Sequence, residues 1–248
     1  MQKSIFTAAL EDFLTKKFLT LTFAPFFLTL LLFSWLFWGA GGELLDILSQ
    51  LAQDPNAIQD PAIANFVQEH PWIATIASSA IFKILFGTIL ALLGTLLAIL
   101  LSTATATIIM GFFTPTVVRE IHRRHYSHIP IEGGIGALEY LWLALKIILK
   151  SIGLFLLAII LYFIPLLNAL AINIPFYYLF HSFLSLDVGG EIYRAKELET
   201  ILKRYRTKVM GTTAILYLIT LIPFAGMILQ VYFVSVMAHL FFRIKADQ

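Results

Sequence analysis

The chain has 248 residues, of which 59% are hydrophobic and only 13% are charged, and its formal net charge is +2. A soluble domain carries roughly 25% charged residues, so this composition excludes a water-soluble globule and predicts an integral membrane protein. The small net charge does not indicate a nucleic-acid-binding surface, which needs basic residues clustered on a soluble face. Because the chain has no cysteine, disulfides, thiolate metal sites and cysteine nucleophiles are excluded.

The first half of the chain contains two long apolar stretches. Residues 18–42 are predicted to form one spanning helix, because about 20 residues cross the hydrocarbon layer. An acidic segment, 43–70, precedes a longer helix expected at 72–118, which is tilted or projects beyond the bilayer. Basic segments occupy 119–150 and 187–208. We expect one membrane domain that covers the whole chain.

Two further apolar stretches, 151–186 and 209–242, are interrupted by proline, asparagine or glycine at 164–175 and 222–226. Since proline removes a backbone donor and clashes with the preceding turn, each stretch is predicted to form two short helices around a corner. Halves of about 12 to 16 residues are marginal for a full crossing. Half-penetrating helices are therefore expected, and complete but tilted hairpins remain an alternative. The predicted fold is an all-α integral membrane protein with two long transmembrane helices and two broken helical hairpins.

The distribution of charge predicts the orientation. Residues 43–70 contain five acidic side chains and no lysine or arginine, whereas 119–150 contain five basic residues and 187–208 contain six. By the positive-inside tendency, both termini are expected in the cytoplasm and residues 43–70 outside. Because both broken stretches have basic flanks, each is expected to enter the membrane and return to the same side.

None of the predicted membrane stretches contains aspartate or glutamate. Carriers driven by protons or sodium place a carboxylate inside the membrane, so this absence argues against that class. The sequence also contains no His-Glu-x-x-His motif, phosphate-binding glycine loop or Gly-x-Ser-x-Gly elbow. We therefore predict a protein that is not an enzyme and uses no cofactor.

A threonine and two lysines, Thr15, Lys16 and Lys17, stand just before the first span. They could form an anion site, where two ammonium groups and the free backbone donors of a helix start converge on an oxyanion. The alternative is an ordinary positive flank of a transmembrane helix.

Polar residues at the two breaks are candidates for lining a cavity that an anion crosses. They are Asn168, Asn173, Pro175, Pro223, Gly226 and Gln230. The alternative is an ordinary turn, capped by asparagine and buried against protein. His181 and His239 are either gates of the same path or hydrogen-bonding residues of helix packing.

Three histidines, His122, His125 and His128, occur in the run His-Arg-Arg-His-Tyr-Ser-His. The first two share a helix face, but His128 lies off it, no acid or cysteine completes the set, and the arginines repel a cation. We expect no metal site here, and instead a contact with anionic headgroups or an incoming anion.

Small residues recur every three to four positions along the second long helix. They are Gly87, Ala91, Gly94, Ala98 and Ser102. This spacing lets helix backbones approach closely and predicts a packing seam, which either another helix of the chain or a second subunit could fill.

The sequence resembles the CysZ-type sulfate permeases, which belong with the etoposide-induced membrane proteins. The resemblance is clearest from Leu161-Tyr-Phe-Ile-Pro165 to Asp187, and again at Leu221-Ile-Pro-Phe-Ala-Gly-Met227 and the terminal helix. It is weaker over the start of the chain, the first span, and Phe112-Phe-Thr-Pro115 with Glu120.

This resemblance implies an all-helical fold with half-penetrating helices, a homo-oligomer, and sulfate uptake for cysteine synthesis across the bacterial inner membrane. Family members bind sulfate at a glycine-hydrophobic-arginine-arginine stretch, whose positions are here Leu14, Thr15, Lys16 and Lys17. Lysine is a point charge where arginine offers a planar fork. The predicted function is a passive, channel-like permease for sulfate or a related small oxyanion. The alternative is a non-transporting assembly or lipid-binding protein of the membrane.

Overall fold

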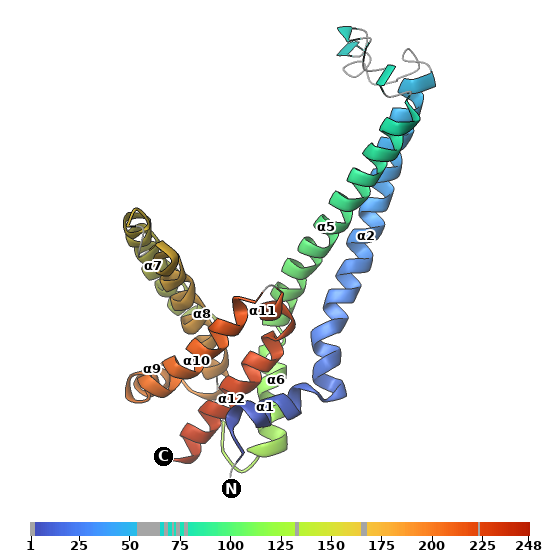
Figure 1. Cartoon of the computed structure of the whole chain (residues 1–248). Helices are drawn as coiled ribbons and strands as arrows, with labels where there is room; N and C mark the ends of the chain where they lie inside the picture. The colour runs from blue at the N-terminus through green and yellow to red at the C-terminus, as the bar shows by residue number, and fades with distance from the viewer. Residues whose placement is uncertain are drawn as a thin grey trace. The chain divides into compact units, whose positions relative to one another are not determined.

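The computed structural model describes the residues 3–53, 65–66, 69–70, 72, 75–76, 79–131, 134–164, 168–222 and 224–248. Every regular element among them is a helix (Figure 1), which confirms the predicted all-α fold. Within this described part of the chain, three helical stretches have the length and apolar composition to cross a membrane: Lys16–Glu43, Ala80–Ala106 and Ala137–Tyr162. The chain forms two compact units, Met1–Phe23 with Thr107–Gln248, and Ala24–Ala106.

The unit Ala24–Ala106 contains most of two long helices, α2 (Lys16–Gln53) and α5 (Ala80–Gly111), which lie side by side within it (Figure 1). Thr29 Oγ1 donates to the carbonyl of Ser102 at 3.2 Å and ties them together. A cavity of about 500 Å³ lies between them. Four of the five small residues of the predicted seam line it, namely Gly87, Ala91, Gly94 and Ala98. The structure thus places α2 of the same chain opposite the seam.

The predicted helix 72–118 is wrong at its C-terminal end, because α5 ends at Gly111 and a separate helix, α6 (Thr114–His125), follows. Pro115 lies in the first turn of α6, where its missing N–H costs nothing. The same residue could not have continued α5. Part of the predicted N-terminal extension of this helix lies outside the described residues.

In the larger unit, the central element is α12 (Gln230–Ala246), which is buried along most of its length. It packs against α1 (Ile5–Phe13), α6 and α8 (Asn168–Ile192). A helix that is apolar on nearly all sides is typical of a core position. This packing brings polar groups from the start, middle and end of the chain to one place.

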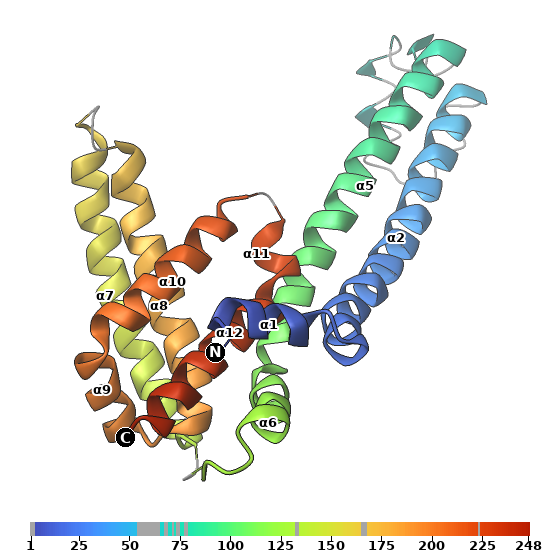
Figure 2. The ribbon, with the colours of Figure 1, turned by 60° about the horizontal axis from the view of Figure 1, so that its bottom comes forward.

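The first broken stretch forms a hairpin of α7 (Ala137–Tyr162) and α8, which run side by side (Figure 2). The break after Tyr162 overlaps the predicted interruption at 164–175, but α8 already begins at Asn168 and α7 begins far before residue 151. The prediction of two short helices is wrong here, because α7 and α8 have 26 and 25 residues. Lys146 and Lys150, which suggested a loop, lie exposed on its surface, where long lysine stems are readily accommodated. The predictions for Asn173 and Pro175 are also wrong in detail, because both residues lie inside α8 and not in the corner.

The second broken stretch follows α9 (Ala195–Arg204) and comprises α10 (Arg206–Thr220), α11 (Ala225–Ile228) and α12. The corner begins at Leu221, one residue before the predicted interruption at 222–226, and is shorter than predicted, because Ala225 and Gly226 lie in α11. Phe224 adopts a left-handed backbone conformation, with φ of 65°, at this corner. Residues other than glycine rarely adopt this conformation.

Substitutions at Phe224 test this corner. We expect Phe224→Gly to be about 1 kcal/mol more stable than Phe224→Ala, because both remove the ring and only glycine adopts positive φ freely. The midpoint of thermal denaturation in detergent, followed by circular dichroism, should be about 2 to 4 °C higher for the glycine variant. An alanine variant of equal or greater stability would contradict the left-handed corner.

Candidate functional site

The predicted anion motif lies at the junction of α1 and α2. Thr15 closes this junction, because both its N–H, at 3.0 Å, and its Oγ1, at 2.6 Å, donate to the carbonyl of Asp12. Lys16 and Lys17 therefore fall in the first turn of α2. The backbone N–H groups of a first turn have no intrahelical acceptor and carry partial positive charge.

The carboxylate of Glu120 in α6 is buried, with 5% of the residue exposed, and accepts hydrogen bonds from three cationic side chains. Its Oε2 accepts from Lys17 Nζ at 2.8 Å. Its Oε1 accepts from Arg123 Nη2 at 2.8 Å and from Arg124 Nε at 2.7 Å. The hydrogen bonds from Arg123 and Lys17 outweigh the effect of burial and lower the pKa of Glu120 to about 2.

Arg124 links this carboxylate to the junction of α1 and α2. Its Nη1 donates to Asp12 Oδ1 at 3.2 Å and to Thr15 Oγ1 at 3.3 Å, and its guanidinium lies 5.2 Å from the ring centroid of Phe18. We call Lys16, Lys17, Arg123 and Arg124 the basic cluster. With the carboxylates of Asp12 and Glu120 among them, these four cations leave two positive charges in excess.

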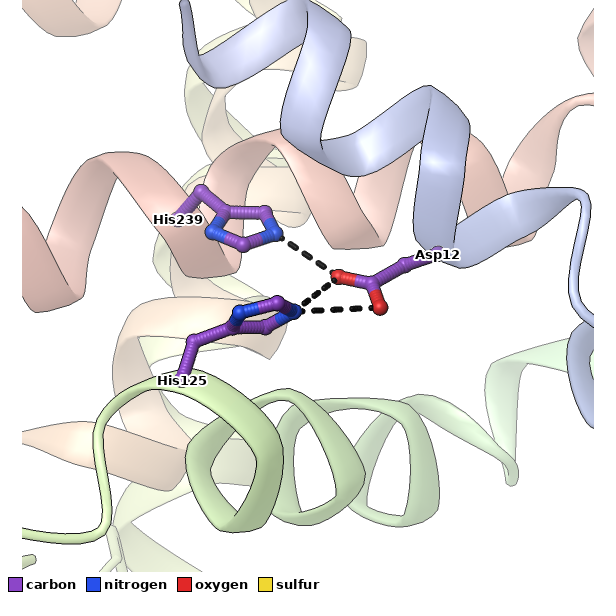
Figure 3. A group of neighbouring side chains, drawn as sticks. All are labelled: Asp12, His125 and His239. Atoms are coloured by element: carbon purple, nitrogen blue, oxygen red, sulfur yellow. Dashed lines mark hydrogen bonds and ion pairs between the residues drawn. The ribbon is translucent and has the colours of Figure 1, made fainter. Parts of the chain in front are cut away.

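A second group of polar side chains adjoins the basic cluster. Figure 3 shows Asp12 of α1 facing His125 of α6 and His239 of α12, and we call these three the acid–histidine cluster. Asp12 Oδ2 lies 3.0 Å from Nε2 of each ring. The second nitrogen of His239, Nδ1, lies 2.9 Å from the hydroxyl of Tyr126.

Burial and charge differ among the members of the acid–histidine cluster. Asp12 and His239 are 4% and 1% exposed, whereas 43% of the His125 side chain is exposed. Burial alone would raise the pKa of Asp12, but the hydrogen bonds from His239 and His125 lower it below its ordinary value. The sequence pattern indicates both histidines as candidate residues, but no spacing pairs either of them with Asp12.

Two of the residues predicted to line the anion path, Asn173 and His181, instead form hydrogen-bond contacts between helices. Tyr217 donates its hydroxyl to Asn173 Oδ1 at 2.9 Å, and His181 Nδ1 lies 2.8 Å from Thr213 Oγ1. Both contacts join α8 to α10. His239 belongs instead to the acid–histidine cluster.

Three of the other break residues lie in helices. Asn168 begins α8, and Pro223 and the Asn168 side chain are outside the described residues. Gly226 lies in α11, packed against Thr220. Gln230 begins α12, and its buried Oε1 has no hydrogen-bond partner within the described part of the chain.

Comparison with known proteins identifies the family. A family model described as "Sulfate transporter CysZ/Etoposide-induced protein 2.4" matches residues 5–229. Neither the curated proteins nor the solved structures gave a match. The match covers nearly the whole chain, including residues of both units, the basic cluster and the broken hairpins up to the residue before α12. The chain therefore belongs to the family of the sulfate transporter CysZ and etoposide-induced protein 2.4, as a sulfate-transporter-like membrane protein.

Proposed function

We propose that the protein is a passive, channel-like permease for sulfate or a related small oxyanion. The observation that carries this proposal is the convergence of three cationic side chains on the single carboxylate of Glu120, beside the start of α2. Groups that hold one carboxylate in this way have the charge and hydrogen-bond donors that bind a sulfate dianion. Lys16 adds an exposed fourth cation.

The basic cluster would capture the anion by competition with Glu120. Side-chain exposure is 49% for Lys17 and 74% for Arg123, so an anion from solution can reach both. A dianion bound there would share their donors with the carboxylate, or would take them over. Because Glu120 already satisfies these cations, binding would be moderate, as release into a conduction path requires.

The path itself would run along the broken hairpins. α10 and α12 have 15 and 17 residues, lengths of about 22 and 26 Å that fall short of the roughly 30 Å hydrocarbon layer. Half-penetrating helices of this kind would bring Gly226 and Gln230 toward mid-membrane depth, and Asn173 of α8 would face the same path through its contact with Tyr217 of α10. We propose that both termini are cytoplasmic.

Removing the two lysines at the start of α2 tests the anion site. We expect Lys16→Ala/Lys17→Ala to lower the uptake of labelled sulfate into proteoliposomes by about tenfold or more, because hydrogen bonds to charged groups contribute about 1.5 to 3 kcal/mol each. Lys16→Arg/Lys17→Arg keeps both charges and should retain uptake.

The matched control is Lys203→Ala/Lys208→Ala, which removes two exposed lysines outside the basic cluster and should leave uptake within about twofold of wild type. Equal uptake by the Lys16→Ala/Lys17→Ala protein and wild type would remove the proposed site. An equal loss of sulfate uptake in the control would show that the effect arises from the change in net charge and not from the proposed site.

A second candidate function, binding of anionic phospholipid, is favoured by one observation. A cavity of about 480 Å³ beside α7 is lined by three lysines, Lys146, Lys150 and Lys196, together with Trp142 and the buried Ser185. Basic pockets between membrane helices bind anionic headgroups. The hydroxyl of Ser185 has no hydrogen-bond partner in the described structure.

Retention of bound lipid by the purified protein tests the second function separately from sulfate transport. We expect Lys146→Ala/Lys150→Ala to lower the affinity for phosphatidylglycerol by about tenfold to thirtyfold, since each lysine near a headgroup contributes about 1 kcal/mol. Native mass spectrometry of the detergent-solubilised protein measures it, with Lys16→Ala/Lys17→Ala as the control that keeps the lipid. Unchanged lipid affinity would exclude the cavity as a headgroup site.

A further inference from the structure

The acid–histidine cluster brings together one carboxylate and two imidazoles from three different helices. One oxygen of Asp12 and one nitrogen each of His125 and His239 lie within 4.8 Å of one another. Two imidazoles and one carboxylate are a donor set for divalent transition metals, zinc among them. We propose that this cluster binds one divalent transition-metal cation, with Zn²⁺ the best match to its donors.

The distances fit such an ion. Nε2 of both rings lies 3.0 Å from Asp12 Oδ2. Ligand atoms about 2.0 to 2.1 Å from a tetrahedral zinc are about 3.3 Å apart. A widening of these two contacts by a few tenths of an ångström, with the two Nε2 atoms, which lie within 4.8 Å of each other, brought to a similar separation, would admit the cation. Three protein ligands leave the fourth position for water.

The proton of the buried His239 ring has an acceptor when Nε2 binds a metal. Metal binding needs the lone pair of Nε2, so a neutral ring must carry its proton on Nδ1. For His239 this N–H would donate to the hydroxyl of Tyr126, 2.9 Å away. Since a tyrosine hydroxyl both donates and accepts, Tyr126 supports the ring with or without the ion. Metal-ligating histidines are oriented by second partners of this kind.

Charge and access are compatible with binding. Arg124 contacts the other oxygen of Asp12, Oδ1, at 3.2 Å and leaves Oδ2 to the rings. Its positive charge opposes a cation, but Glu120 accepts from its Nε at 2.7 Å and offsets part of that repulsion. Asp12 and His239 are buried, so the ion would enter past the half-exposed His125.

No local spacing predicts this site, because Asp12, His125 and His239 are far apart in the sequence. His128, which belongs to the same histidine run as His125, is exposed and is not a member of the acid–histidine cluster. A bound ion would join α1, α6 and α12 directly. It would stabilise the start of the chain against the core, whether or not the protein conducts sulfate.

The test uses the full chain without an affinity tag, stripped with a chelator in detergent and titrated with Co²⁺ and then Zn²⁺. We expect one Co²⁺ per chain with the visible absorption of tetrahedral coordination, its displacement by Zn²⁺, and a higher midpoint of thermal denaturation with saturating Zn²⁺. His125→Ala should weaken binding by more than about tenfold, and Tyr126→Phe by about tenfold.

His128→Ala is the matched control, because it removes a nearby exposed histidine that the acid–histidine cluster does not contain. It should bind Co²⁺ like wild type. The proposal is overturned if stripped wild type binds no Co²⁺, if His125→Ala binds as tightly as wild type, or if His128→Ala is weakened equally. None of these readouts depends on sulfate uptake.

Discussion

Replacing Glu120 with glutamine is expected to lower the midpoint of thermal denaturation by about 5 to 10 °C. The carboxylate holds Lys17, Arg123 and Arg124 on two oxygens, and an amide can accept from them on one oxygen only and without charge. Removing one partner of a buried ion pair costs about 3 to 5 kcal/mol. Because Lys17 and Arg123 are exposed enough to regain water, we expect about 2 to 3 kcal/mol here.

Lowering the pH should also show that the stability of the protein depends on ionised Glu120. Since folding lowers the pKa of Glu120 from 4.5 to about 2, its ionised form stabilises the protein fully above pH 4.5. That contribution is lost as the pH falls toward 2, and Glu120→Gln should lack this part of the acid sensitivity. Added sulfate should restore part of the stability of the variant, because it supplies negative charge to the same cations.

The control for this variant is Glu199→Gln, which breaks the exposed pair with Lys203. We expect a change within about 0.5 kcal/mol, since exposed ion pairs contribute little. A Glu120→Gln protein as stable as this control would show that Glu120 does not organise the basic cluster. Stability unaffected by sulfate would argue against anion binding there.

Asp12→Asn is expected to have the second largest effect, a loss of about 2 to 3 kcal/mol measured with a chelator present. The buried carboxylate accepts from His239, His125 and Arg124. The asparagine amide would offer one acceptor oxygen and turn two N–H donors toward the remaining groups. His239, almost fully buried, could not replace the lost partner with water.

The neighbouring residue supplies the comparison for Asp12. Glu11 forms an exposed ion pair with Lys3, so Glu11→Gln should change stability by no more than about 0.5 kcal/mol. Thermal denaturation of both variants beside wild type measures the difference. If Asp12→Asn unfolds at the temperature of Glu11→Gln, the acid–histidine cluster contributes nothing to the packing of α1 on α12.

The two corners could be predicted because their signals are local. Proline, asparagine and glycine act on the backbone of their own turn, and the chain breaks after Tyr162 and after Thr220. The start of α7 could not be placed in the same way. Charged residues predict the end of a membrane helix, yet Lys146 and Lys150 extend from the surface of α7.

The basic cluster and the acid–histidine cluster could not be predicted from the sequence, for a different reason. Lys17 and Glu120 are 103 residues apart, and Asp12 and His239 are 227 apart, so no spacing rule pairs them. A local signal did exist. Asp12 shares the buried face of α1 with Ala9 and Phe13, and an acid on an apolar helix face indicates a buried partner. Only the packing of α12 against α1 and α6 identifies that partner.

Sulfate flux into proteoliposomes tests the central claim most directly. Wild-type protein, reconstituted without any proton or sodium gradient, should admit labelled sulfate down its own concentration gradient far faster than protein-free liposomes do. The absence of acidic residues from the predicted membrane stretches predicts that imposing either cation gradient leaves the rate unchanged. Sulfate entry no faster than in empty liposomes, or entry only with a proton or sodium gradient, would contradict a passive oxyanion permease.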